Sequence, residues 1–77
     1  LLRSLTARQI VSALQADGFI IGRQKGSHRR YVHTDGRAVT ISIHRTSDTF
    51  TFKTLRSMIE IQAQWGEKYL RCLKLLR

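Results

Sequence analysis

The segment HRRYVHTDGRAVTISIH, residues 28–44, decides the fold that this sequence predicts. Its second half alternates strictly between apolar and polar side chains, a period of two that is typical of a β-strand with one buried and one exposed face. Residues 34–36, Thr-Asp-Gly, have the composition of a turn. We therefore predict an antiparallel hairpin with strands at about 28–33 and 38–44.

The length of this turn decides which face each side chain occupies, because a slip of one residue moves a strand's side chains to the opposite face. Asp-Gly at 35–36 is a good signal for a two-residue turn, which would pair His28 with Ile43 and point the imidazole into the apolar face. A three-residue loop over 34–36, closed by a left-handed glycine, would instead pair His28 with Ser42 on the open face.

The cost of burial favours the three-residue loop. A two-residue turn places Arg30 in the apolar face, and burying an unpaired guanidinium costs several kcal/mol. The longer loop exposes Val32, which costs about 1.5–3 kcal/mol, and brings Tyr31 into the core. We therefore predict that His28 and Arg30 lie on the open face. Arg29 is expected at the sheet edge, with its stem on apolar atoms and its head in water.

A helix and a further strand are expected before this hairpin. Thr6 and Gln9 have the spacing of a capping box, which predicts a helix over about 7–17 that ends at Gly18. The β-branched segment that follows predicts a strand at about 19–24. A tight turn at 25–27 then leads into the hairpin.

A second helix is expected after the hairpin, with Thr51 as its N-cap and Gly66 beyond its end. Its apolar stripe is Phe52, Leu55, Ile59 and Ala63. A short third helix is expected around Leu70, Leu73 and Leu76. The predicted class is α+β, in the order α-β-β-β-α plus the short C-terminal helix, with the helices packed on one face of a three-stranded antiparallel sheet. One domain is expected over residues 1–77, with a core at about 4–60 and a helical tail at about 61–77.

The charge of the chain indicates a polyanionic partner. The 77 residues carry a formal net charge of +9, and residues 23–45 hold six basic side chains against Asp35 alone, which gives +5. Nucleic acid is the leading candidate for such a partner. The sequence contains no apolar run long enough for a membrane span. It has one cysteine, Cys72, and no metal-ligand spacing, so we expect a cytoplasmic protein that binds no metal, cofactor or membrane.

The stretch Arg23–Arg30 combines a sharp turn, dense positive charge and His28, which favours chemistry on a phosphodiester. A neutral imidazole can remove the proton of an RNA 2′-hydroxyl, and neighbouring cations can stabilise the charge that develops at the phosphorus. We predict His28 as the catalytic residue. His44 is either a second proton-transfer group or simply the polar end of its strand. The predicted RNA-binding residues are Arg23, Lys25, Gly26, Ser27, Arg29 and Arg30.

These features form a pattern that is similar to a known family, the HicA (YcfA-like) toxins, over about residues 4–60. The residues that carry the resemblance are Gly18-Phe19, Arg23–His28, Tyr31, His33, 35–37, 39–44 and 54–59. The resemblance implies a double-stranded-RNA-binding-domain-like fold, translation-independent mRNA cleavage with His28 as the catalytic histidine, and a HicB-like antitoxin that covers the active face. Arg29 stands where many relatives have a second histidine, and Thr34 where many have proline.

The main hypothesis is therefore a toxin that binds and cleaves mRNA without a metal. The alternative is a non-catalytic RNA-binding module of the same fold, which explains the charge equally well. A DNA-binding regulator is disfavoured, because the first helix carries only Arg8 and the second only Lys53 and Arg56. Replacing His28 by alanine separates the first two hypotheses.

Overall fold

The computed structural model describes residues 4–66 and residue 70 of the chain. The elements are α1 (Ala7–Asp17), β1 (Ile20–Lys25), β2 (His28–Val32), β3 (Ala38–Ser42), α2 (Phe52–Arg56) and the π-helical segment η1 (Ser57–Gln62), which continues α2 without a break. This is the predicted order of helix, three strands and helix. The expected third helix lies outside the described residues except for Leu70, which is buried.

The predicted capping box begins α1. The backbone N–H of Gln9 donates to Thr6 Oγ1 at 3.2 Å, and the N–H of Thr6 donates to Gln9 Oε1 at 2.8 Å. The helix ends at Gly18, whose φ of 105° is in the left-handed region that favours glycine. Leu5 before the cap and Ile10 inside the helix are both buried, as a hydrophobic staple requires.

The three strands form an antiparallel sheet in the order β1-β2-β3. The loop between β2 and β3 has three residues, because the N–H of His33 donates to the carbonyl of Arg37 at 2.9 Å and Gly36 has a φ of 97°. The resulting register pairs His28 with Ser42 and Arg29 with Ile41. The prediction of a three-residue loop is confirmed, and the two-residue turn is excluded.

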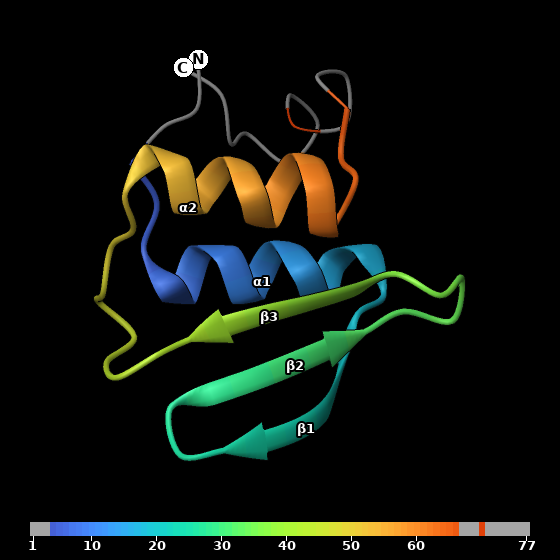
Figure 1. Cartoon of the computed structure of the whole chain (residues 1–77), viewed down its shortest axis with the longest axis horizontal. Helices are drawn as coiled ribbons and strands as arrows, with labels where there is room; N and C mark the ends of the chain where they lie inside the picture. Colours follow the sequence, from blue (N-terminus) through green and yellow to red (C-terminus); the bar gives the residue numbers. More distant parts are fainter. Residues whose placement is uncertain (1–3, 67–69, 71–77) are drawn as a thin grey trace.

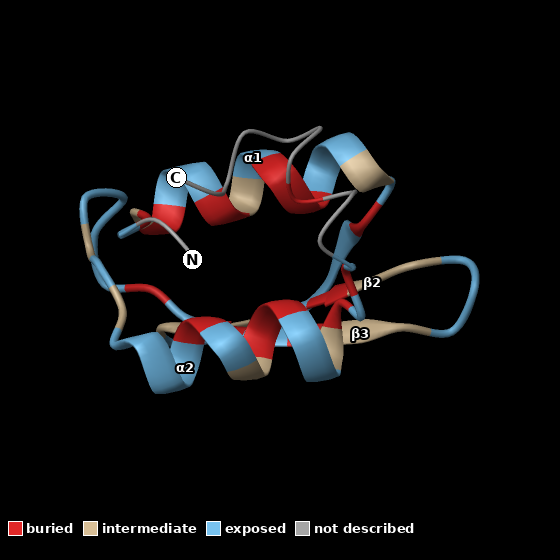
Figure 2. Cartoon of the chain, turned by 90° about the horizontal axis from the view of Figure 1, so that it is seen from above, coloured by how far each residue is buried: buried red, intermediate tan, exposed pale blue. Residues whose placement is uncertain are grey.

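The helices cover one side of the sheet (Figure 1), which makes the α+β class and the one-sided packing correct. Seen from the helix side, buried positions on α1 and on the α2–η1 helix face each other above the strands (Figure 2). The side chains that form this core come from every element except β1 and are Leu5, Ala7, Ile10, Ala13, Leu14, Phe19, Tyr31, Val39, Ile41, Ile43, Leu55, Met58, Ile59, Ala63, Trp65 and Leu70.

Two details of the predicted elements were wrong. Phe52 is 61% exposed, because the second helix packs against β3 through η1 rather than through the first turn of α2. The strand β3 ends at Ser42 instead of His44, since Asp48 Oδ2 accepts the backbone N–H groups of His44 and Arg45, each at 2.9 Å. These two bonds turn the chain away from the sheet and lead it toward α2.

Candidate nucleic-acid interface

The open face of the sheet carries polar side chains in rows across the three strands. Lys25 pairs with His28, and His28 pairs with Ser42, so these three side chains share one face. The next row along the strands is Arg23, Arg30 and Thr40. His28 and Arg30 are exposed, as the predicted loop length required. The structure thus brings His28 together with Lys25, Arg23 and Arg30.

A bulge at Gly22 gives β1 this orientation. Ile21 pairs with Tyr31 and Arg23 pairs with Arg30, so β1 has one more residue than β2 between these pairs. A regular strand would alternate and place Arg23 on the helix side with Ile21. The extra residue instead places Arg23, and therefore also Lys25, on the open face. This bulge was not predicted from the sequence.

Glycine suits this position because any side chain would press against Val32. A Cβ on Gly22 would lie 3.1 and 3.2 Å from the two Cγ atoms of Val32. Val32 belongs to the open face, in the row of Ile20 and Ala38. An isolated glycine inside a strand often marks a bulge or a close approach, and this was the signal in the sequence that could have revealed it.

The turn between β1 and β2 lies beside His28. Gly26 has a φ of 59°, and a Cβ there would meet no atom within 4 Å, so the turn is open on its outer side. The hydroxyl of Ser27 lies 3.3 Å from the hydroxyl of Ser42, within hydrogen-bonding distance. The carbonyl of Ser27 accepts the N–H of Ile43 at 2.8 Å. These contacts fasten the turn to the end of β3 and fix the backbone next to His28.

The cations of the open face keep their charge available for a ligand. Within the described part of the chain, Arg23, Lys25 and Arg30 form no ion pair, whereas Arg37 and Arg56 do. An oligoanion on this face would therefore meet three uncompensated positive charges around one imidazole. Such an arrangement favours phosphate contacts.

Arg29 does not belong to this group. It pairs with Gln24 and Ile41, and so lies on the helix side of the sheet, opposite His28. The expectation of a position at the sheet edge was wrong, because β2 is the central strand. The side chain is half-buried, with its Nε atom shielded from solvent. Of the predicted RNA-binding side chains, it is the one that the register separates from the others.

His44 is exposed and follows β3, where its backbone N–H is held by Asp48. It lies beyond the last residue of β3, so the sheet register does not place it on the face of His28, and its role stays a prediction. His33 lies on the helix side and takes part in a polar network at the opposite end of the hairpin.

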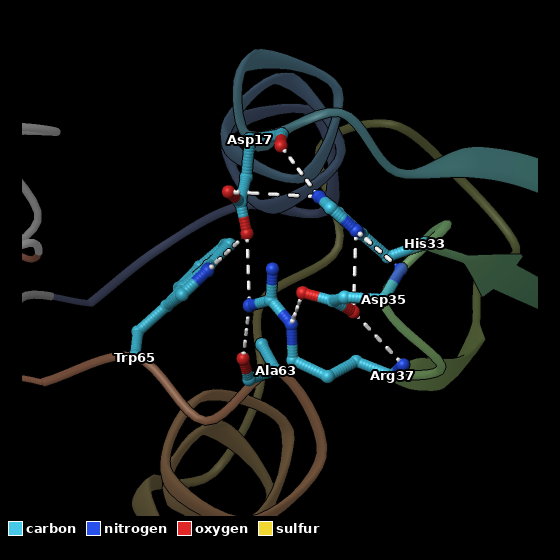
Figure 3. Close-up of polar contacts among 6 residues, drawn as sticks. All are labelled: Asp17, His33, Asp35, Arg37, Ala63 and Trp65. Atoms are coloured by element: carbon cyan, nitrogen blue, oxygen red, sulfur yellow. Dashed lines mark hydrogen bonds and ion pairs between the residues drawn. The ribbon is translucent and has the colours of Figure 1, made fainter.

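That network joins the end of α1, the 34–36 loop and the residues after η1 (Figure 3). His33 Nε2 donates to the carbonyl of Asp17 at 2.8 Å, and His33 Nδ1 accepts the N–H of Asp35 at 3.1 Å, which requires the tautomer with the proton on Nε2. Trp65 Nε1 donates to Asp17 Oδ2 at 2.9 Å. Arg37 Nη1 donates to the carbonyl of Ala63 at 2.6 Å.

The network stabilises the loop that sets the hairpin register. The backbone N–H of Arg37 donates to Asp35 Oδ1 at 3.0 Å, and this bond, with the nearby guanidinium, lowers the pKa of the Asp35 carboxyl. The Arg37 guanidinium lies 5.0 Å from the centre of the Phe19 ring. The network is thus a structural device at one end of β2, whereas His28 lies at the other end.

The described residues contain neither a metal-binding cluster nor a membrane-spanning helix. Within that part of the chain, no set of three or more His, Cys, Asp or Glu side chains is close enough to hold a metal ion. No helix among the described residues is long and apolar enough to cross a membrane.

A comparison with protein families matches residues 7–65 to the model of the HicA toxin of bacterial toxin–antitoxin systems. The match spans both helices, the sheet and the basic turn. The chain belongs to the HicA toxin family. It is therefore a toxin of a toxin–antitoxin system, and such a toxin implies an antitoxin as its partner. No curated protein matches the HicA chain significantly.

Proposed function

We propose that this HicA toxin binds and cleaves mRNA as a metal-independent endoribonuclease, with His28 as the proton-transfer group. The observation that supports the proposal is the row of Lys25, His28 and Ser42 on the open face, next to the row of Arg23, Arg30 and Thr40. An exposed imidazole among unpaired cations has the composition that 2′-hydroxyl attack on an RNA phosphodiester requires. The cytoplasm, where mRNA is found, is the proposed location.

In the proposed reaction, neutral His28 removes the proton of a ribose 2′-hydroxyl, and the 2′-oxygen attacks the adjacent phosphorus. The bond from phosphorus to the 5′-oxygen breaks, and that oxygen takes a proton from water, which leaves a 2′,3′-cyclic phosphate and a 5′-hydroxyl end. Protonated His28 then returns its proton to the hydroxide that remains. Lys25 and Arg30, which share the open face with His28, would stabilise the additional negative charge of the transition state. The backbone of Gly26 and the hydroxyl of Ser27 would hold a phosphate oxygen at the turn.

A variant of His28 tests the proposal. We expect His28→Ala to lower the rate of RNA cleavage at least 100-fold, within the range typical of general acid–base catalysis, and to abolish growth arrest in cells. The side chain of His28 is exposed, and the residue is paired in the sheet through its backbone. The His28→Ala variant should therefore unfold at the same temperature as the wild type. A His33→Ala variant, altered at the other end of β2, controls for the loss of a histidine and is expected to lose stability instead.

The outcomes separate the two functions. Undiminished cleavage by a folded His28→Ala chain would overturn the catalytic role. If the wild type binds RNA but never cleaves it, the chain is the RNA-binding module without turnover. Binding should then depend on Lys25 and not on His28.

A further inference from the structure

A pocket of about 220 Å³ lies on the helix side of the sheet, between α1 and the beginning of β2. Its position is opposite the face that carries His28, because Arg29 in its wall pairs with Ile41 on the helix side. The side chains that shape it come from α1, β2 and the residues after β3, and include Arg8, Val11, Ser12, Gln15, Arg29 and Ile43.

The pocket is positively charged and has no counter-charge. Two of its lining residues, Arg8 and Arg29, are basic, and none of the described residues that line it is acidic. Arg29 Nε is buried and has no hydrogen-bond partner among the described residues. Buried charged groups in proteins are normally paired or hydrogen-bonded. An unpartnered guanidinium nitrogen in the wall of an open pocket therefore points to an anionic group that the isolated chain lacks.

We propose that this pocket receives a glutamate side chain of the antitoxin, whose carboxylate binds Arg29 and Arg8. The proposal rests on the toxin's having an antitoxin partner. A guanidinium and a carboxylate match in shape and can form two parallel hydrogen bonds. Ser12 and Gln15 on α1 add polar groups at the same pocket. This contact lies on the side of the sheet away from the proposed RNA site, and so adds to the cover of the active face that the family resemblance implies.

Two observations favour a protein carboxylate over an RNA phosphate. Val11, Ile43 and Ala7 give the pocket apolar walls, which suit the methylene groups of a glutamate better than the sugars attached to a phosphodiester. The volume is below the usual 300–1,000 Å³ of small-molecule sites and fits a single side chain. The cations of the open face, by contrast, lie on an exposed strand surface that a nucleic-acid backbone can follow.

The experiment compares Arg29→Met with Arg30→Met. The two residues are neighbours in β2, and each substitution removes one positive charge, but from opposite faces of the sheet. The full 77-residue chain is titrated calorimetrically with the protein encoded by the reading frame next to its gene. It is also titrated with a 2′-O-methyl RNA oligonucleotide, which cannot be cleaved through a 2′-hydroxyl. We expect Arg29→Met to weaken binding of the protein about tenfold or more and to change RNA binding less than twofold. Arg30→Met should weaken RNA binding.

A direct measurement accompanies the titration. The ¹⁵N resonance of Arg29 Nε–H should shift when the partner protein binds and stay unchanged when the oligonucleotide binds. The proposal is overturned if Arg29→Met weakens binding of the RNA but not of the protein, because the pocket would then be a phosphate site. It is equally overturned if the variant unfolds at the wild-type temperature and binds both the protein and the RNA as tightly as the wild type does. It is also overturned if the neighbouring protein does not bind the wild type. RNA cleavage is measured separately from binding of the partner protein. Failure of the proposed function can therefore be distinguished from failure of the proposed antitoxin contact.

Discussion

The guanidinium of Arg37 lies 2.9 Å from the carboxylate of Asp17, and so joins the residue after the hairpin loop to the last residue of α1. Both side chains are largely buried, at 17% and 15% exposure. The same guanidinium lies 2.7 Å from Asp35 through its Nε atom. One arginine therefore holds the loop in the conformation that decides which face His28 occupies.

Replacement of Arg37 by methionine should destabilise the fold. It removes the ion pair with Asp17 and the hydrogen bond to the carbonyl of Ala63 from a largely buried site, and we expect the free energy of unfolding to fall by about 2–4 kcal/mol, measured by urea denaturation. The control is Arg56→Met, because Arg56 pairs with Glu60 at the surface at 3.6 Å. That change should cost less than about 0.5 kcal/mol. Equal losses in the two variants would contradict the structural role of Arg37.

The stability of the protein should depend on pH through Asp35. The hydrogen bond from the Arg37 backbone lowers the pKa of this carboxyl below its ordinary value of 3.8. A lowered folded-state pKa contributes stability that is present above the unfolded-state pKa and is lost as the pH falls through the folded-state pKa. We therefore expect the free energy of unfolding to decrease as the pH falls below about 4.

The Asp35→Asn variant tests this assignment. It should show a smaller decrease over the same acidic range, measured by thermal unfolding at a series of pH values. The decrease should not vanish, because Asp48 accepts the N–H groups of Arg45 and His44 and its pKa is lowered as well. An unchanged acidic slope in Asp35→Asn would contradict the assignment.

The bulge predicts a specific steric conflict. Gly22→Val places a branched side chain against both Cγ atoms of Val32, which already lie 3.1 and 3.2 Å from a Cβ at this position. We expect a loss of about 1–3 kcal/mol in the free energy of unfolding. Adding Val32→Ala should recover at least half of that loss, as a double-mutant cycle would show. Additive effects of the two substitutions would mean that the close approach is not the cause.

Lys25 should contribute one phosphate contact. Lys25→Met is expected to weaken binding of single-stranded RNA and to reduce the slope of log K against log salt by about 0.7, the value for one phosphate of a single strand. The matched control is Lys53→Met, which removes the same charge from the exposed surface of α2. Equal reductions in both variants would indicate that only the net charge matters.

Much of the fold was predictable from local patterns. The capping box at Thr6 and the left-handed Gly18 act within a few residues, and the alternation over 38–44 reports one buried face directly. The three-residue loop could be preferred over the two-residue turn on one ground, the free-energy cost of burying Arg30. This choice also placed His28 correctly, since the open face follows from parity alone.

The rest depended on contacts between distant segments. The network joins Asp17, the 34–36 loop and Trp65, which are separated by up to 48 positions, and no local pattern links them. The pocket at Arg29 forms only when α1 packs above β2. Phe52 was wrongly predicted to be buried. The spacing of apolar residues shows which face of a helix is apolar, but it does not show which turns along the helix contact the sheet.

The bulge at Gly22 has a genetic consequence. Gly22 is one residue more than the pairing of β1 with β2 requires, so the loss of its codon would restore regular alternation in β1. Ile21 would still lie opposite Tyr31 and Arg23 opposite Arg30, so both cations of β1 would stay on the open face. In-frame deletion of Gly22 is therefore expected to preserve toxicity better than in-frame deletion of Arg23 or Lys25, and a deletion scan of the gene would show this difference.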